Sequence, residues 1–471
     1  MQAYPDASDH VIEEAMQSAW SCFHSFRKRP GTDRANLLLG IARHLYERKE
    51  QLVSVADAET SLGQDRLYSE LNRTISELKL FATLAESGEW TEEWEEQPEP
   101  NRKPLPKPSM QTRHVPIGPV VVIGACNFPF AISVVGTDSA SALAVGCPVV
   151  VKAHPQHART CQSLADLASQ ALKETNMPPQ AFQLVHGTAH SVTRKLIEHP
   201  RTSCVAFTGS LEGGRELHKI AAQRPEPIPF HAEMGSMNPV FVLPQALEEK
   251  GRELASAFVS AVNLFGGQMC TKPGLLVLID SPAVEPFLAC IRETVRQTES
   301  SRMLNQPVFE NYRSISAELA SSLNLIASNQ TALDDNERFA FCQVFEIKGM
   351  DFMKNRALRT EAFGPASIIV RCKDENELIE IVRSMEGSLT ATIHARNQDR
   401  ELAERLFPLI ESRVGRFLWG GFPPGVIPGI ATHHGGPWPA TTDSRHTSIG
   451  LFGYRRFVRP VCRQGFPANE C

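Results

Sequence analysis

The stretch Val120-Val-Val-Ile-Gly-Ala-Cys-Asn-Phe-Pro129 opens the part of the chain that decides the fold. A run of four β-branched residues is broken by a turn that contains glycine, and small residues suited to a helix follow over 131–145. The same order recurs, with apolar runs at 149–151, 182–185 and 204–207 and helical patterns at 157–173, 189–198 and 211–222. Continuous apolar strands that alternate with helices predict a parallel sheet covered on both faces. This is a doubly wound α/β domain.

A second series of the same kind follows and predicts a second Rossmann-like domain. Its strands are expected at 240–243, 275–279, 367–370, 390–394 and 417–419, and its helices at 245–264, 282–298, 375–385 and 398–410. The first 90 residues show helical apolar spacing. Residues 86–111 are rich in glutamate and then in proline, which predicts an extended, solvated connector between packed elements.

The composition is that of a globular protein that can bury a large core. Of 471 residues, 42% are hydrophobic and 21% are charged, which excludes wholesale disorder. Lys and Arg total 48 against 53 Asp and Glu, so the net charge of −5 gives no sign of a nucleic-acid partner. We find neither a membrane-spanning apolar run nor a signal peptide, and we therefore expect a cytoplasmic protein with no membrane span.

The cysteines give a further indication of compartment. Eleven are scattered along the chain, none in a CxxC pair. Such a set predicts reduced thiols and no disulfide framework. Because paired ligands are missing, we also expect no metal site.

Three local features could carry chemistry, although each has an ordinary structural explanation. Gly209, Ser210 and Gly214 lie where a strand passes into a helix, which suits a phosphate but also suits any α/β turn. Cys270 follows a glycine pair in a turn, and it is either a nucleophile or a buried thiol. Glu233 lies at the boundary between the two series, as a general base or as a solvated carboxylate.

The order of these features with others is more specific than any one of them. The motifs run in the order Gly124-x-x-Asn127-Phe-Pro, Lys152 at the end of a strand, Phe207-Thr-Gly-Ser210, Glu233-Met-Gly235, Gly267-Gln-Met-Cys270 and Glu361-Ala-Phe-Gly-Pro365. From about residue 12 to its end, the chain resembles the aldehyde dehydrogenase superfamily. Val150-Val-Lys152-Ala-His-Pro155, Arg224-Pro-Glu-Pro-Ile-Pro229, Ala232-Glu-Met-Gly-Ser-Met-Asn-Pro239 and His434-Gly-Gly-Pro-Trp-Pro-Ala-Thr-Thr-Asp443 are similar to the branch of α-ketoglutaric semialdehyde and bacterial fatty aldehyde dehydrogenases.

The resemblance implies an aldehyde substrate and a mechanism through a thioester. Cys270 would attack the aldehyde, the Asn127 amide and the Cys270 N–H would hold the oxyanion, and Glu233 would activate the hydrolytic water. The positions that it implies for binding the cofactor are Lys152, His154, Gly187, Thr208, Gly209, Ser210, Gly214, Arg215, Glu361 and Phe363.

The cofactor is expected to be NAD or NADP, with NADP favoured. Many relatives have Lys-Pro-Ser-Glu where this chain has Lys152-Ala-His-Pro155. That glutamate would repel a 2′-phosphate, so its absence removes a reason to exclude NADP. His154 and Arg215 could contact the 2′-phosphate by charge or by a hydrogen bond.

The substrate that the resemblance implies first is α-ketoglutaric semialdehyde (2,5-dioxopentanoate). Alternatives are a long-chain fatty aldehyde, a CoA-acylating reaction through the same thioester, and a catalytically silent homologue that only binds. Arg416, Trp419 and Phe422 lie near the residues that line the substrate tunnel in the family, where an arginine could pair with a distal carboxylate. A surface ion pair explains Arg416 equally well. A shortened region at 295–345 leaves the choice of aldehyde open.

The resemblance also divides the chain. Residues 1–90 and 112–234 would bind the cofactor, 235–430 would be the catalytic domain, and 91–111 and 431–471 would form a small β arm for oligomerisation. We expect a homo-oligomer, either a dimer or a tetramer, in which this arm adds a strand across a subunit interface.

Overall fold

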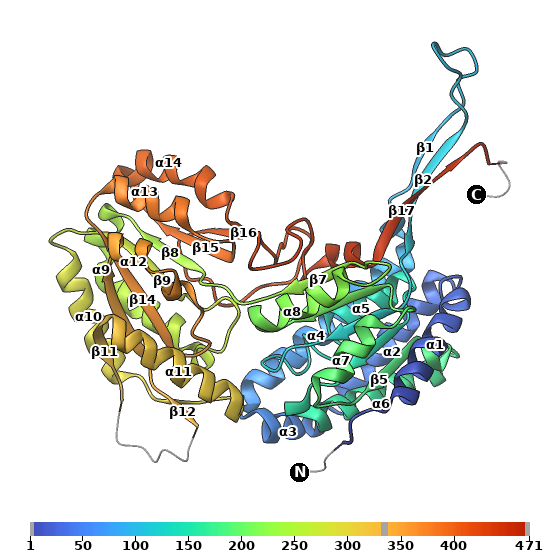
Figure 1. The fold of residues 1–471 in the computed structure, drawn as a ribbon, viewed down its shortest axis with the longest axis horizontal. Helices are drawn as coiled ribbons and strands as arrows, with labels where there is room; N and C mark the ends of the chain where they lie inside the picture. Colours follow the sequence, from blue (N-terminus) through green and yellow to red (C-terminus); the bar gives the residue numbers. More distant parts are fainter. Residues whose placement is uncertain (1–3, 331–337, 467–471) are drawn as a thin grey trace.

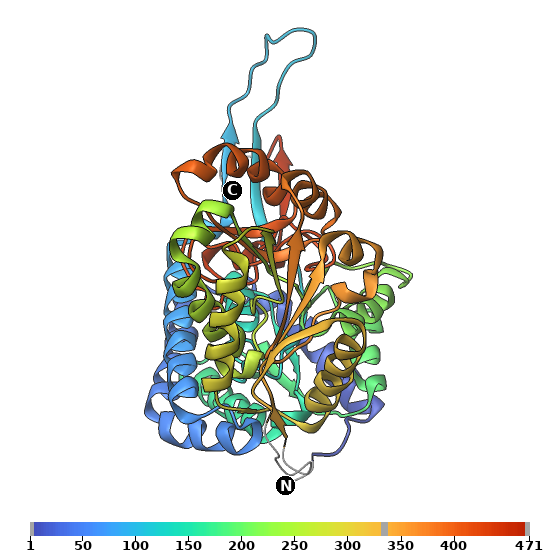
Figure 2. The same ribbon diagram turned by 90° about the vertical axis from the view of Figure 1, so that its left-hand side faces the viewer.

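The computed structural model describes residues 4–330 and 338–466. Two parallel sheets, each flanked by helices, form two lobes, and a small antiparallel sheet projects away from one of them (Figures 1 and 2). The predicted class, two doubly wound domains with a small β arm, is confirmed. None of the helices within these described ranges is long and apolar enough to cross a membrane.

The first lobe is built on a five-stranded parallel sheet in the order β5-β4-β3-β6-β7. The strands are β3 (Val120–Ile123), β4 (Val149–Lys152), β5 (Phe182–Val185), β6 (Cys204–Thr208) and β7 (Phe230–Glu233). The helices are α1 (Asp9–Phe26), α2 (Gly31–Glu47), α3 (Lys49–Thr60), α4 (Gln64–Ser87), α5 (Thr137–Val145), α6 (Ala158–Glu174), α7 (His190–Glu198) and α8 (Leu211–Ala222).

Both faces of this sheet are apolar, as its sequence predicts. Val120 and Val122 belong to the core that α2 to α6 form on one face, whereas Val121 and Ile123 belong to the core with α1 and α7 on the other. Alternate residues of one strand therefore enter two different cores, which explains why the strand is apolar without interruption.

The second lobe contains a seven-stranded sheet in the order β11-β13-β14-β9-β8-β15-β16. Only β11, at one edge, runs antiparallel to its neighbour. The strands are β8 (Pro239–Val242), β9 (Leu275–Ile279), β11 (Asn324–Ser328), β13 (Gln343–Lys348), β14 (Ala366–Cys372), β15 (Ser388–His394) and β16 (Val414–Trp419), with the short pair β10 (Ser301–Arg302) and β12 (Phe339–Ala340) beside them. The helices are α9 (Pro244–Asn263), α10 (Val284–Gln297), α11 (Gln306–Ser322), α12 (Gly349–Lys354), α13 (Glu375–Ser384) and α14 (Arg400–Glu411).

The arm is a three-stranded antiparallel sheet of β1 (Trp94–Glu96), β2 (Met110–Pro116) and β17 (Val458–Gln464). The acidic, proline-rich connector thus forms a hairpin with an exposed tip that extends away from the body (Figure 1). From the predicted arm segment 431–471, β17 is the part that joins this sheet, whereas residues around 434–448 lie beside β7. The division into domains and the role of the arm in oligomerisation stay predictions.

One predicted helix is wrong in its bounds. The small residues 131–145 were expected to be helical throughout, but α5 begins at Thr137. The preceding residues fold back on themselves, since Ala125 N–H donates to the Ile132 carbonyl and Thr137 N–H to the Ala131 carbonyl. This compact turn carries Asn127 and continues from the carboxyl end of β3, where ligands bind in sheets of this kind.

Candidate active site

Three segments that are far apart in the sequence meet at the junction of the lobes. Glu233 ends β7, Cys270 lies in the turn after the short helix η4 (Leu264–Gly267), and His434 lies between β16 and β17. The Cys270 Sγ lies 3.6 Å from His434 Nε2, and the same nitrogen lies 3.0 Å from Glu233 Oε1. A thiol, an imidazole and a carboxylate therefore form one cluster, in which all three side chains lie within 4.8 Å of one another.

Glu233 is buried and held from two sides. The Ser448 hydroxyl donates to Glu233 Oε2, while His434 faces Oε1. Burial alone would raise the pKa of Glu233, but the neighbouring His434 and the bond from Ser448 outweigh it and lower the pKa. The carboxylate is thus ionised at neutral pH and can accept a proton.

Cys270 is held in a rigid turn and is protonated at rest. Asn238 Nδ2 donates to the Cys270 carbonyl at 2.8 Å and to the Lys272 carbonyl at 2.9 Å, which fixes the turn on both sides of the thiol. Burial, followed by the charges of Glu233 and Glu361, raises the pKa of Cys270 well above its ordinary value. A thiol in this state needs a proton acceptor before it can attack a carbonyl.

Asn127 lies in the turn after β3 and faces the segment that carries the thiol. Its Nδ2 donates to the Gln268 carbonyl at 3.0 Å, and the side chain is buried. An amide nitrogen has two N–H donors, so the second can serve an oxygen atom placed near Cys270. Of the three residues that the sequence predicts to be catalytic, Cys270 and Glu233 therefore lie in one cluster, and Asn127 contacts the segment that carries Cys270.

Sequence reasoning missed His434. The residue was quoted within the His434-Gly-Gly-Pro segment but received no role, because it is separated from Cys270 by 164 residues. Its side chain is completely buried, and its Nδ1 atom has no hydrogen-bond partner in the described structure. A fully buried histidine between a carboxylate and a thiol was the available signal, and only the fold reveals it.

The predicted adenosine side of the cofactor site lies at the carboxyl ends of β4 and β5. Lys152 ends β4 and is buried, and Gly187 follows β5 where a Cβ atom would come within 2.8 Å of Val192. His154 stacks on His157 and accepts a hydrogen bond from the Gln156 N–H. Burial lowers the pKa of His154 well below its usual value, so His154 is neutral and can offer a hydrogen bond but no charge.

The predicted phosphate-binding turn joins β6 to α8. Thr208 ends β6, and the Ser210 side chain caps α8 by accepting from the Gly213 N–H. Gly209 N–H donates to the Glu233 carbonyl at 3.1 Å, which ties this turn to the strand of the candidate base. The α8 terminus leaves N–H groups and partial positive charge for a phosphate.

Two more α8 residues complete this turn. At Gly214 a Cβ atom would lie 2.4 Å from Met234 Sδ, so any larger residue would require Met234 to move. Arg215 is exposed on the same helix and is free to reach a 2′-phosphate.

The predicted nicotinamide side contains Glu361 and Phe363, which are both half-buried in the segment before β14. Glu361 Oε1 is shielded from solvent and has no hydrogen-bond partner among the described residues. Burial raises the pKa of Glu361 to about 7, an effect that the nearby Lys272 opposes. An unpartnered carboxylate oxygen beside Gly235, whose Cβ would lie 2.5 Å from Glu361 Oε2, fits a ribose hydroxyl group.

Of the three residues expected near the substrate, Arg416 lies where its charge acts on Cys270. Arg416 donates to the carbonyls of Pro423 and Gly425, and it is not in the expected surface ion pair within the described structure. Trp419 is 63% exposed. Phe422 packs against Phe258 in the core of the second lobe.

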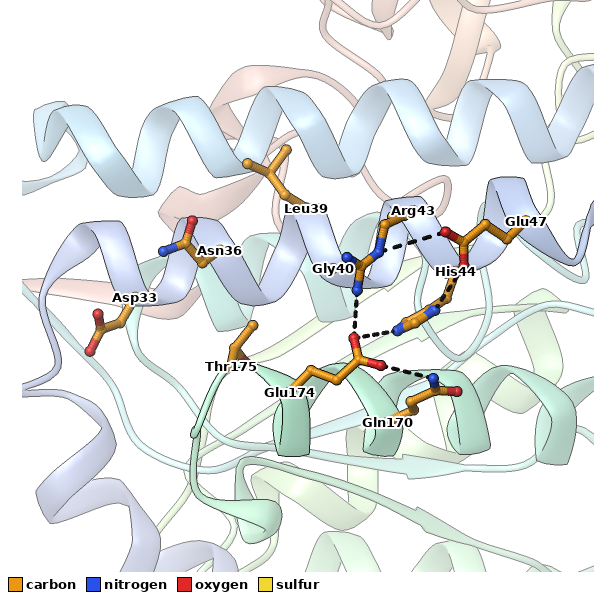
Figure 3. A pocket seen from close by; sticks show the side chains of 10 residues that line it. All are labelled: Asp33, Asn36, Leu39, Gly40, Arg43, His44, Glu47, Gln170, Glu174 and Thr175. Carbon is orange, nitrogen blue, oxygen red and sulfur yellow. Dashed lines mark hydrogen bonds and ion pairs between the residues drawn. The ribbon is translucent and has the colours of Figure 1, made fainter.

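Two groups of side chains are spaced so that they could hold a metal ion. One is the thiol cluster itself, and the other lies behind Glu233 and consists of His231, Asp443 and His446. A recess between α2 and α6, lined by Arg43, His44 and Glu174 among others, contains none of the predicted site residues (Figure 3).

Comparison with known proteins agrees with this arrangement. The model of the aldehyde dehydrogenase family matches residues 1–411. The chain is 39% identical over 463 residues to α-ketoglutaric semialdehyde dehydrogenase 2 of Azospirillum brasilense, covering 98% of this chain and 88% of that protein. It is also 39% identical to the α-ketoglutaric semialdehyde dehydrogenase of Acinetobacter baylyi, with the same coverage.

Solved structures show the same fold. A 1-pyrroline-5-carboxylate dehydrogenase from Thermus with bound NAD is 22% identical, with a TM-score of 0.81 over 98% of this chain and 86% of that chain. A glyceraldehyde-3-phosphate dehydrogenase from Methanocaldococcus jannaschii in complex with NADP is 20% identical, with a TM-score of 0.81 over 98% of this chain and 96% of that chain. The protein therefore belongs to the NAD(P)-dependent aldehyde dehydrogenase family.

Proposed function

We propose that this aldehyde dehydrogenase oxidises α-ketoglutaric semialdehyde to the corresponding dicarboxylic acid through a thioester on Cys270. The identity of 39% to two α-ketoglutaric semialdehyde dehydrogenases supports the choice of substrate. The convergence of the Cys270 thiol, the His434 imidazole and the Glu233 carboxylate within 4.8 Å is the observation that carries the chemistry.

The first half of the reaction is the attack of Cys270 on the aldehyde carbon. The thiol proton passes to His434 Nε2, which lies 3.6 Å from the sulfur. The Glu233 carboxylate on the same nitrogen stabilises the protonated imidazole. A new C–S bond then forms while the carbonyl π electrons move to oxygen, and the Asn127 amide with the Cys270 N–H stabilises that oxyanion.

Residues of the first lobe fit the dinucleotide. Lys152, Gly209, Ser210 and Gly214 would hold its adenosine and pyrophosphate portions, and the unpartnered Glu361 Oε1 would accept from a ribose hydroxyl group. When bound, the nicotinamide would accept the hydride that leaves the former aldehyde carbon, so that a thioester remains on Cys270.

The second half of the reaction is hydrolysis of the thioester. Glu233 takes a proton from a water molecule, whose oxygen attacks the acyl carbon. The C–S bond breaks, the carboxylic acid leaves, and Cys270 regains its proton. Ser448 and His434 orient the carboxylate for this step by holding one oxygen each.

A panel of aldehydes tests the proposal. Formation of NADH or NADPH should be fastest with 2,5-dioxopentanoate, slower with long-chain fatty aldehydes, and independent of added CoA. Cys270→Ser should abolish it. A requirement for CoA, or full activity in the Cys270→Ser variant, would refute the thioester hydrolysis, whereas a preference for fatty aldehydes would refute only the substrate.

We also propose that NADP is accepted and preferred, and that the protein is a homodimer or homotetramer joined through the β1-β2-β17 arm. The absence of an acidic residue after Lys152 and the exposed Arg215 support the cofactor preference. The long exposed hairpin supports the arm (Figure 2). A much higher kcat/KM with NAD, or a stable monomer in size-exclusion chromatography, would contradict these two proposals respectively.

A further inference from the structure

A buried arginine near the thiol lacks an acidic partner. Arg66 on α4 is 7% exposed, and its Nη2 donates to the carbonyl of Asn127 at 2.5 Å. Its Nη1 is shielded from solvent without a hydrogen-bond partner, and none of the ion pairs of the described residues involves Arg66. Because a buried cation with an unused donor is costly, this site favours a further anion in addition to the nearby Glu70, which forms no ion pair with Arg66.

Two aromatic rings fix the guanidinium of Arg66. Its Cζ lies 4.5 Å from the ring centroid of Phe265 and 5.1 Å from that of Phe128. Phe128 follows Asn127, while Phe265 lies in η4 five residues before Cys270 and is 41% exposed. The cation therefore lies between the two segments that carry the oxyanion amide and the thiol, beside a side chain that reaches solvent.

Two neighbouring charged residues of α4 have partners for some of their polar atoms, whereas Arg73 Nη2 and Glu70 Oε2 have none among the described residues. Arg73 Nε lies 3.3 Å from Glu77 Oε1, and Glu70 Oε1 accepts from the backbone N–H groups of Phe130 and Ala131. Glu70 attracts Arg66 electrostatically without forming an ion pair with it, and Arg66 also interacts with the thiolate form of Cys270. Arg66 thus keeps a donor for a ligand. Arg73 Nη2 also lacks a partner in the described structure, but Arg73 is already paired with Glu77.

We propose that Arg66 binds the distal carboxylate of the substrate and makes the enzyme selective for short aldehydes that carry an acid group. This inference rests on the proposed function, because it assumes that the aldehyde carbon is at Cys270. A planar guanidinium held between two rings offers directed donors, which suits a carboxylate better than the flexible ammonium of lysine would. Arg416, the arginine expected from the sequence, donates from both terminal nitrogens to the Gly425 and Pro423 carbonyls, so only its Nε is buried without a partner in the described part of the chain.

The test compares 5-oxopentanoate with its methyl ester, which has the same reacting aldehyde but no charge. Wild-type kcat/KM should be at least about tenfold higher for the acid, and Arg66→Gln should lower the acid-to-ester ratio by roughly 10- to 100-fold. Arg66→Lys should restore part of the ratio. Arg194→Gln, in the exposed pair with Glu198 on α7, should leave the ratio unchanged.

The outcomes separate a subsite from a purely structural role. If Arg66 only supports the Asn127 carbonyl, Arg66→Gln lowers kcat/KM for both compounds by the same factor, and the proposal is overturned. If the Arg66→Gln variant does not fold, the wild-type enzyme alone provides the test. A wild-type acid-to-ester ratio of kcat/KM near one then overturns the proposal. Rapid oxidation of the ester with no preference for the acid leaves the proposed dehydrogenase chemistry intact, whereas oxidation of neither compound defeats both.

Discussion

Replacing Glu233 by Gln should lower the pKa of Cys270 and so make the resting thiol more reactive at neutral pH. The negative charge of Glu233 disfavours the neighbouring thiolate and is, after burial, the largest cause of the raised pKa of Cys270. Gln keeps the size of the side chain and removes the charge. The variant should nevertheless lose turnover, because it cannot activate water for hydrolysis of the thioester.

The separation of the groups sets the size of this effect. The Cys270 sulfur and the Glu233 carboxylate lie within 4.8 Å of each other. At an effective dielectric constant of about 20, two unit charges at that distance repel by about 3.5 kcal/mol. This energy corresponds to about 2.5 pKa units. Because Glu233 also stabilises the imidazolium that would receive the thiol proton, part of the change is cancelled, and we expect a fall of roughly one to two units.

The assay is the rate of alkylation of Cys270 by iodoacetamide as a function of pH, followed by mass spectrometry of the peptide that contains it. Below the thiol pKa the rate rises about tenfold per pH unit, so the Glu233→Gln profile should be displaced to lower pH. Cys126, half-buried beside Asn127, serves as an internal reference because desolvation raises its pKa to about 11. A displacement to higher pH would refute the reasoning, since it would mean that the stabilisation of protonated His434 by Glu233 outweighs the direct repulsion between Glu233 and the thiolate.

Three further predictions follow from the same geometry. His434→Gln removes the proton acceptor that lies 3.6 Å from the sulfur. We expect the single-turnover rate of thioester formation to fall by about 10²- to 10⁴-fold, while the cofactor affinity measured by fluorescence is retained. An unaltered burst of NADH would contradict this role. Arg215→Ala removes an exposed cation from α8 and should raise the KM for NADP several-fold more than the KM for NAD. If steady-state kinetics show equal changes in the two KM values, Arg215 does not bind the 2′-phosphate. Phe258→Ala removes a fully buried ring from the core of the second lobe and should lower the free energy of unfolding by about 3–5 kcal/mol. Calorimetry should show a Tm lowered by several degrees, with kcat per folded molecule unchanged. An unchanged Tm would show that this core can collapse around the gap.

The regular elements of both lobes could be predicted because their apolar patterns are local. The strands β3 and β9 and the helix α8 match their predicted bounds. The elements that escaped prediction depend on distant partners. The edge strand β11 pairs antiparallel with β13 and exposes its first two residues, so its sequence lacks a buried apolar run. Strand β2 is defined mainly by β17, more than 300 residues away in the chain.

The catalytic candidates were predictable for a different reason. Cys270, Glu233 and Asn127 each lie in a motif whose order along the chain resembles a known family, so no knowledge of their contacts was needed. Arg66 lies outside these motifs, and His434 lies inside one of them but received no role. What marks them is burial together with an unsatisfied nitrogen atom, and neither property is visible in the sequence.

The shared nitrogen of His434 couples the two halves of the proposed reaction. His434 Nε2 faces both the Cys270 sulfur and the Glu233 carboxylate, and one nitrogen can hold only one proton. While that proton is on Nε2, the thiolate and the carboxylate are both stabilised, which suits the attack on the aldehyde. Once the thioester forms, the sulfur no longer carries charge, so Glu233 becomes the only anion facing His434. A proton taken from water by Glu233 then has a direct path to the departing sulfur through the same imidazole. One proton remains from the thiol and the water together, and it leaves to solvent, as the overall oxidation of an aldehyde to an acid requires.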